Sequence, residues 1–128
     1  MPVEFTPTLS VALCRANPTW AFVFGDNAER WGFKGQAVIR SEPNAVGVRT
    51  KWAPKTYDAS YFYDHQYDSI VAMIDEDFAV IFELLRSNCI VVFPEEGLGT
   101  GLAELHIRAP RAYSYLVDRL VEASNVTA

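Results

Sequence analysis

The sequence predicts an α/β fold, in which short buried strands alternate with amphipathic helices, and one domain over residues 1–128. Two continuous apolar runs, at residues 20–24 (WAFVF) and 89–93 (CIVVF), are each bounded by turn residues, which is typical of strands buried on both faces. Residues 67–86 and 109–123 instead repeat apolar side chains every three or four positions, as helices that pack on one side do. This alternation favours a largely covered sheet.

The chain begins with a short strand and a weak helical segment. Residues 3–6 fit the strand, which Pro7 ends because proline cannot donate a hydrogen bond to a continuing ladder. The residues that follow carry a weak helical pattern, and Asn17-Pro18 stops it.

Between the two apolar strands the sequence predicts a glycine-containing loop, a short helix, a further strand and a second loop. The first apolar strand stops at Gly25, and residues 28–41 form a tight loop that leads into the short helix. Residues 45–50 (AVGVRT) fit a strand. Residues 53–67 are rich in Tyr, Asp and Ser, and they predict an irregular surface loop.

The two predicted helices each carry one apolar stripe. In residues 67–86 the stripe consists of Ile70, Ile74, Phe78, Ile81 and Leu85. In residues 109–123 it consists of Tyr113, Leu116, Val117, Leu120 and Val121. Pro110 suits the first position of its helix, where the missing N–H costs nothing. The stripes predict which face of each helix is buried.

Composition argues against several classes of protein. The 11 Lys and Arg residues against 16 Asp and Glu give a formal charge of −5, which argues against broad binding to nucleic acid polymers or to anionic membranes. Cys14 and Cys89 are the only cysteines, and neither they nor the two histidines show a metal-ligand spacing, so we expect core thiols, no metal and no cofactor. The sequence shows no signal peptide and no apolar run near ~18 residues, so we expect a cytoplasmic protein without a membrane span.

The most informative segment is the loop after the second apolar strand. It reads FPEEGLGTGLAEL at residues 93–105, with Gly97, Gly99 and Gly101 at alternate positions. Such glycines let the backbone approach a ligand and turn several N–H groups in one direction. Loops at the carboxyl ends of strands are also the usual ligand crevice of α/β sheets. The alternative is a flexible connector whose glycines only fix turns.

A second glycine-containing loop follows the first apolar strand. It joins Asp26 and Asn27 to two glycines and to the cations Arg30, Lys34 and Arg40. Two such loops at one crevice would offer N–H groups, cations and a carboxylate to a phosphate-bearing ligand. Alternatively, Asp26-Asn27 caps the turn that follows, and the cations are solvated.

Acid–base chemistry has weaker support in the sequence. Glu95, Glu96 and Glu104 lie beside the glycine loop, where a carboxylate is able to position water or to contact a ribose. Adjacent glutamates on a loop are more often simply solvated. No Ser/His/Asp or Cys/His set is evident.

Three blocks of sequence occur in an order that a known family shares. They are RWGFKGQAVI at residues 30–39, VRTKW at residues 48–52 followed by YDSI at residues 67–70, and the glycine-rich segment at residues 93–105. In these blocks the chain resembles the macrodomain family, in its terminal ADP-ribose protein glycohydrolase branch, from residue 22 to residue 120. It also resembles macrodomain-like sequences of tailed phages, for which the location would be the host cytoplasm.

The resemblance implies a three-layer α/β/α fold with a central mixed sheet and a crevice for ADP-ribose or a related nucleotide. The residues that it places on the ribose side are Gly32, Gly35, Gln36 and Ala37. Those that it places at the phosphates are Gly97, Gly99, Thr100, Gly101 and Leu102. The second loop adds Asp26, Asn27 and Arg40 to the expected ligand site.

Two departures from the family pattern affect the expected chemistry. Its catalytic aspartate falls on Ala103, and its catalytic lysine falls near Arg40, whose guanidinium does not readily form a Schiff base. We therefore expect the protein to bind and sequester a nucleotide rather than cleave it by that route. The alternatives are a ligand-free scaffold that contacts proteins through residues 57–67, and an ADP-ribosyl hydrolase or phosphatase that uses another acidic residue: Asp26, Glu96 or Glu104.

Overall fold

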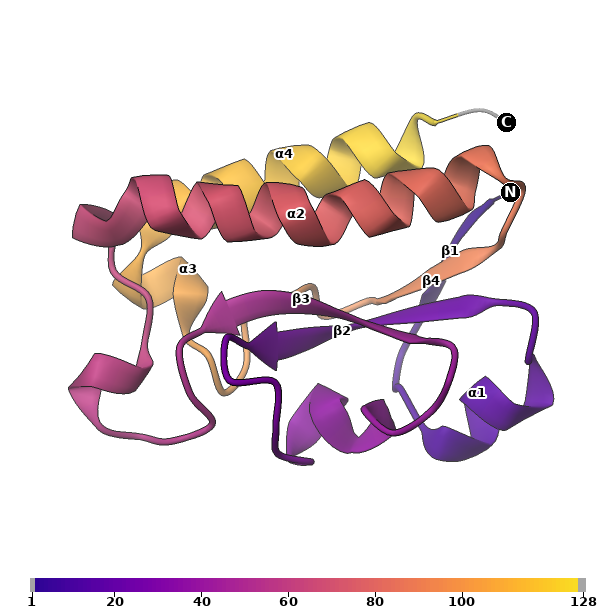
Figure 1. Cartoon of the computed structure of the whole chain (residues 1–128), viewed down its shortest axis with the longest axis horizontal. Helices are drawn as coiled ribbons and strands as arrows, with labels where there is room; N and C mark the ends of the chain where they lie inside the picture. Colours follow the sequence, from indigo (N-terminus) through magenta and orange to yellow (C-terminus); the bar gives the residue numbers. More distant parts are fainter. Residues whose placement is uncertain (1, 127–128) are drawn as a thin grey trace.

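The structure, a computed structural model that describes residues 2–126, contains a four-stranded parallel sheet with helices on both faces (Figure 1). The strands are β1 (Val3–Thr6), β2 (Ala21–Asn27), β3 (Ala45–Lys51) and β4 (Val91–Pro94), in the spatial order β1-β4-β2-β3. The predicted α/β class is confirmed. The expectation of a mixed sheet is wrong for the described strands, because every ladder between them is parallel and each connection crosses back over the sheet.

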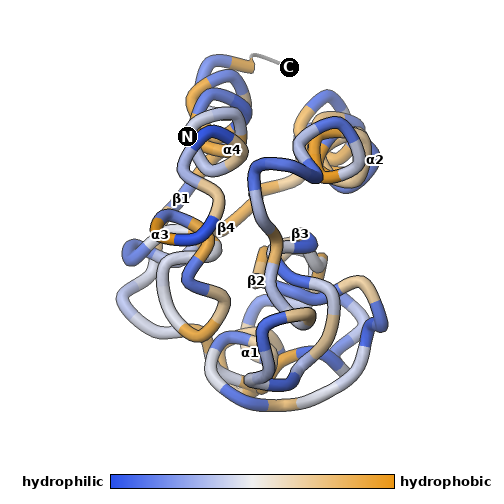
Figure 2. The backbone as a smooth tube through the Cα atoms, turned by 90° about the vertical axis from the view of Figure 1, so that its left-hand side faces the viewer, coloured by the Kyte–Doolittle hydropathy of each residue, from blue (hydrophilic) through white to orange (hydrophobic). Residues whose placement is uncertain are grey.

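Helices cover the two faces unequally. The long helices α2 (Tyr67–Arg86) and α4 (Pro110–Ser124) lie on one face, and the short α3 (Leu105–Arg108) leads into α4. The other face carries α1 (Val11–Ala16) and the 3₁₀ helix η1 (Gly35–Ile39). Seen end-on in Figure 2, α2 and α4 lie side by side, with α1 at the opposite side of the sheet.

The sheet separates two apolar cores. The larger core joins α2 and α4 to strand residues that include Val23, Val48 and Val91. The smaller core lies on the other face of the sheet and joins α1 and η1 to Phe22 and Phe24 of β2. Side chains of β2 therefore alternate between two dry environments, which explains why its sequence is continuously apolar.

Element boundaries follow the predictions closely, with informative exceptions. The bounds of β1 and α2 are as predicted, and α4 is shifted by one residue. The strand β2 continues past Gly25 to Asn27, because β3 pairs with it along this length. The strand β4 begins at Val91 rather than at Cys89, and it ends with Pro94, after which the Glu95 N–H still donates to the Thr6 carbonyl of β1 at 2.8 Å.

The tyrosine-rich loop is more ordered than the sequence predicts. It contains the 3₁₀ helices η2 (Asp58–Ser60) and η3 (Asp64–Gln66), and a bridge joins Lys51 to Tyr61. Phe62 is fully buried and meets the Trp52 ring edge-on at 4.9 Å between centroids. The prediction of a plain surface loop is therefore wrong here, because its aromatic side chains close one end of the larger core.

The same loop also caps the last helix. The carboxylate of Asp64 accepts hydrogen bonds at 3.0 Å from the backbone N–H groups of Arg111 and Ala112. Pro110 stands at the helix start, as predicted. A negative charge here also suits the positive end of the helix dipole. Within residues 2–126, no helix combines the length and the apolar character that crossing a membrane requires.

We expect Phe78→Ala to lower the free energy of unfolding by about 3–5 kcal/mol, because Phe78 is fully buried between α2 and the sheet. Val80 lies on the same helix but is 52% exposed, so Val80→Ala should cost less than about 0.5 kcal/mol. Urea denaturation followed by circular dichroism measures both. Equal losses in the two variants would contradict the packing of α2.

Candidate functional site

The chain leaves the neighbouring strands β2 and β4 toward opposite faces of the sheet. After β2 it turns to η1, and after β4 it turns to α3 and α4 (Figure 1). The ladder between the two strands covers only the pairs Ala21–Val91 and Phe22–Val92, so no ladder joins them at their carboxyl ends. In parallel sheets such a point leaves a crevice beyond the carboxyl ends, where ligands bind.

One side chain of η1 spans this gap. Gln36 accepts a hydrogen bond from the Gly25 N–H at 2.8 Å through Oε1. Its Nε2 donates to the Gly97 carbonyl at 2.9 Å and to Glu96 Oε1 at 2.8 Å. The two glycine-containing loops that the sequence analysis singled out therefore lie against each other. Leu102 also lies close to Gly35, since a Cβ added there would lie 3.4 Å from Leu102 Cδ1.

The loop after β4 carries a run of free backbone donors. Gly97 and Gly99 have φ values of 89° and 80°, which favour glycine, and the Leu105 N–H donates back to the Gly99 carbonyl at 2.7 Å. The N–H groups of residues 98–103 have no acceptor within the described part of the chain, although Leu98 and Gly99 are buried. Buried N–H groups are nearly always paired, so the donors on the buried residues Leu98, Gly99 and Ala103 are the part of this run that an anion would satisfy, whereas Gly101 and Leu102 are exposed to water.

The glycines of this loop have different structural roles. A Cβ on Gly99 would lie 2.9 Å from Leu105 Cβ, so the bare backbone is required for packing. A Cβ on Gly101 would meet nothing within 4 Å, and Gly101 is exposed. Gly101 is therefore the position at which the surface of the loop can be changed without disturbing the fold.

The predicted site residues Asp26 and Arg40 form a buried ion pair. Asp26 Oδ1 lies 2.5 Å from Arg40 Nη2 and accepts the Asn27 N–H at 2.8 Å, and the Asp26 side chain is only 2% exposed. Arg40 also donates to the carbonyls of Gly32 at 2.8 Å and Trp31 at 3.2 Å. In this structure the pair holds the loop after β2 in place, and the Asp26 carboxylate is occupied by protein donors.

Arg30 extends this pair into a network with two residues that the sequence analysis missed, Arg49 and Asp77. Its guanidinium lies 2.8 Å from Asp26 Oδ2 and 2.7 Å from Asp77 Oδ1. Burial opposes the charge of Arg30, but its hydrogen bonds to Asp26 and Asp77 outweigh burial and raise its pKa. Asp77 also accepts the backbone N–H of Arg49 at 2.8 Å and its Nε at 3.1 Å.

This network covers the free edge of β3. The outward N–H of Arg49 is taken up by Asp77, and the outward carbonyl of Gly47 accepts from Arg30 Nη1 at 3.1 Å. A Cβ on Gly47 would overlap Asp26 Oδ2, which explains the glycine in this strand. An open hollow of about 440 Å³ lies along the same edge, lined in part by Arg30, Arg40 and Val80.

Glu104, the other predicted catalytic residue, turns toward α3. Its φ of 49° is left-handed, and its Oε1 accepts from Arg108 Nε at 2.8 Å. Arg108 lies over the Tyr61 ring at 3.8 Å and donates to the Tyr63 hydroxyl at 2.7 Å. The hydrogen bond to Glu104 is the main reason that the pKa of Arg108 is raised. Lys51 also lies over the Tyr61 ring, and burial, together with the charge of Arg108, lowers its pKa.

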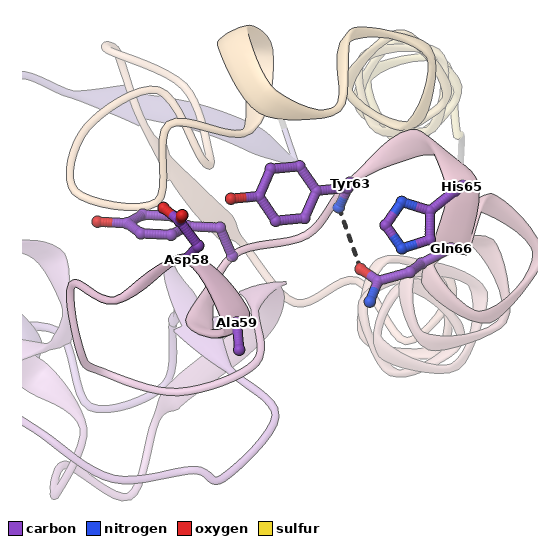
Figure 3. Close-up of a pocket in the computed structure, with 6 residues that line it drawn as sticks. Asp58, Ala59, Tyr63, His65 and Gln66 are labelled. Atoms are coloured by element: carbon purple, nitrogen blue, oxygen red, sulfur yellow. Dashed lines mark hydrogen bonds between the residues drawn. The ribbon is translucent and has the colours of Figure 1, made fainter.

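An aromatic hollow lies beside this cluster (Figure 3). It measures about 550 Å³, and its lining residues are Asp58, Ala59, Tyr61, Tyr63, His65 and Gln66. The Tyr63 and His65 rings are nearly parallel, with 6.0 Å between centroids, and the Tyr63 N–H donates to Gln66 Oε1 at 3.1 Å. This hollow is formed by the tyrosine-rich loop and does not include the glycine loops.

The remaining predicted residues have mixed positions. Ala37 packs in the smaller core, so its side chain is a packing residue. Asn27 donates to the Trp31 carbonyl at 2.8 Å, and its buried Oδ1 has no partner within residues 2–126. Thr100 donates to the Glu96 carbonyl at 2.7 Å, and Leu102 is 63% exposed. In the described part of the chain, no group of His, Cys, Asp and Glu has the arrangement of a metal site.

We expect Asp77→Asn to lower the free energy of unfolding by about 2 kcal/mol, because it leaves Arg30 and Arg49 without a charged partner. The cost is below that of a fully buried pair, since the Arg30 side chain is 42% exposed. Glu76→Gln is the matched control, because Glu76 also pairs with Arg49 but is 74% exposed. Equal unfolding midpoints for the two variants would contradict a structural role for Asp77.

Comparison with known proteins identifies the family but not an activity. No curated protein and no solved structure was found to match this chain. One family model matches residues 4–119, which include both glycine loops and the whole sheet except Val3. The chain therefore belongs to a family of unknown function, DUF7831.

Proposed function

We propose that this protein binds ADP-ribose or a related nucleotide through its phosphates, in the crevice between the loops after β2 and β4. The observation that carries the proposal is the run of backbone N–H groups at residues 98–103, which have no acceptor among the described residues. Each buried donor left without a partner costs about 1–3 kcal/mol, so a phosphate that accepts from several of them recovers this free energy on binding. The two loops also follow the carboxyl ends of neighbouring strands, where α/β sheets usually bind ligands.

The loop after β2 supplies the neighbouring part of the proposed site. Gly35 and Gln36 come next to the β4 loop through the contact with Leu102 and the hydrogen bond to Gly97. Gly32, Gly35 and Gln36 are the residues that resemble the ribose-side loop of macrodomains. Helices on both faces of the sheet support a macrodomain-like fold as part of the same proposal.

The residues at the two catalytic positions of the resembled branch, and the hydrogen-bond partners of Asp26 and Glu104, favour binding over cleavage. Ala103 stands where the resembled branch has its catalytic aspartate, and Arg40, near the place of the lysine, is engaged with Asp26. Asp26 accepts from three protein groups, and Glu104 accepts from Arg108. A carboxylate held by cations is a weaker base toward water, which applies to Asp26 and, through one oxygen, to Glu104. Within residues 2–126, the Glu96 carboxylate accepts only from the neutral amide of Gln36, so cleavage through Glu96 is not disfavoured in this way.

Calorimetric titration with ADP-ribose, followed by chromatography of the recovered ligand, tests the proposal. Heat of binding with intact ligand is the expected result. Multiple turnover of ADP-ribosylated protein or of free ADP-ribose derivatives, lost in Glu104→Gln, would instead make the protein a hydrolase. No heat with any nucleotide would contradict the proposal and favour a scaffold that contacts proteins.

We expect Gly101→Val to weaken nucleotide binding by about tenfold or more, because a branched side chain would stand among the donors of the loop. Its unfolding midpoint should match that of the wild type, since a Cβ there meets nothing within 4 Å. Gly99→Val should lose both stability and binding, because a Cβ there meets Leu105 at 2.9 Å and φ is 80°. Unchanged affinity in a folded Gly101→Val protein would show that the loop is only a connector.

A further inference from the structure

We infer that the crevice selects phosphates that are esterified on both sides over terminal phosphates, and that Glu96 is the residue that makes this selection. This inference rests on the proposed function and names the chemical class of its ligand. A phosphodiester carries one negative charge per phosphorus, whereas a terminal phosphate carries about two near pH 7.

Glu96 lies beside the centre of the donor run. The Thr100 hydroxyl donates to the backbone carbonyl of Glu96 at 2.7 Å, so the backbone of Glu96 lies against the middle of residues 98–103. The carboxylate is placed by Gln36, whose Nε2 also donates to the Gly97 carbonyl at the start of the run. Gln36 Nε2 holds the Glu96 carboxylate at 2.8 Å through Oε1. The second carboxylate oxygen has no hydrogen bond within residues 2–126, so it is available to a ligand.

The cations of the neighbouring loop do not offset this charge. Arg30 and Arg40 are both paired with Asp26, and Arg30 is also paired with Asp77. Lys34 is exposed, with no ion pair in the described part of the chain, and its charge is screened by water. In this proposal a phosphate at residues 98–103 is held by neutral N–H groups, near a carboxylate that Gln36 anchors through one oxygen.

This arrangement has opposite effects on the two kinds of ligand. Like charges repel more strongly near a protein surface than in bulk water, so the second charge of a terminal phosphate is penalised beside this carboxylate. A sugar hydroxyl beside the diphosphate instead donates to the carboxylate, in a charge-assisted hydrogen bond. The site is thus suited to a diphosphate that continues into a sugar.

Three ligands separate the effects of charge and of hydroxyl groups: ADP, its β-methyl ester and ADP-ribose. The methyl ester has one negative charge fewer than ADP and no additional hydroxyl group. ADP-ribose also has one charge fewer, and it carries the hydroxyl groups of a second sugar. Glu96→Gln removes the carboxylate charge but keeps an amide oxygen for Gln36. Glu95→Gln is the matched control, because Glu95 is the adjacent exposed glutamate and gives the same change in net charge.

We expect the wild type to bind the methyl ester about three- to tenfold more tightly than ADP, and ADP-ribose more tightly still. Glu96→Gln should raise the affinity for ADP until it equals the affinity for the methyl ester. It should also lower the affinity for ADP-ribose relative to that for the ester. Glu95→Gln should leave both affinity ratios, ester to ADP and ADP-ribose to ester, within about twofold of the wild type. Raising the salt concentration should reduce the ratio of ester to ADP. Calorimetric titration measures all of these affinities, and thermal melts check that the variants are folded.

The outcomes distinguish this inference from the proposed function. Wild-type protein that binds ADP as tightly as its ester, or equal effects of the two glutamate variants, would overturn the selection by Glu96 and leave nucleotide binding intact. Failure of the wild type to bind any of the three ligands would overturn the proposed function and this inference with it.

Discussion

The short ladder between β2 and β4 is the constraint on which the candidate site depends. These strands pair at two positions only, so the backbone groups beyond that point need other partners. Gln36 supplies them, because its amide accepts from the Gly25 N–H and donates to the Gly97 carbonyl. One side chain thus takes the place of the missing ladder and ties the loop after β4 to β2. A shorter side chain at this position would leave both backbone groups unpaired.

The charged residues around the crevice stabilise its loops rather than offer free charge. The Trp31 carbonyl accepts from both Asn27 and Arg40, and Arg40 is itself held by Asp26. These contacts fix a segment whose glycines would otherwise leave it mobile, and a loop ordered in advance loses less conformational entropy on binding. Because Asp26 is almost fully buried, its two arginine partners offset the cost of removing its charge from water.

Much of the fold could be predicted from the sequence because it depends on periodicity. The apolar stripe that includes Phe78 predicts α2 to its observed bounds. The strand β2 was predicted too short, because Asp26 and Asn27 look like a turn until the arginine partners are known. The parallel arrangement depends on strand order, and the burial of Phe62 depends on Trp52, so neither follows from local pattern. The sequence predicted where elements form better than how they meet.

The candidate site was predictable in its loops but not in the roles of its side chains. Glycine spacing identified both loops, since positive φ and close approach have few other solutions. Three glutamates lie near the β4 loop, and spacing alone does not tell which one lies at the crevice. The left-handed backbone at Glu104 turns that side chain to Arg108, whereas Gln36 holds the Glu96 carboxylate next to the Gly97 carbonyl. A single backbone angle at Glu104 and the single amide of Gln36 therefore decide how these two carboxylates are placed, and the residue types at positions 96 and 104 do not reveal either.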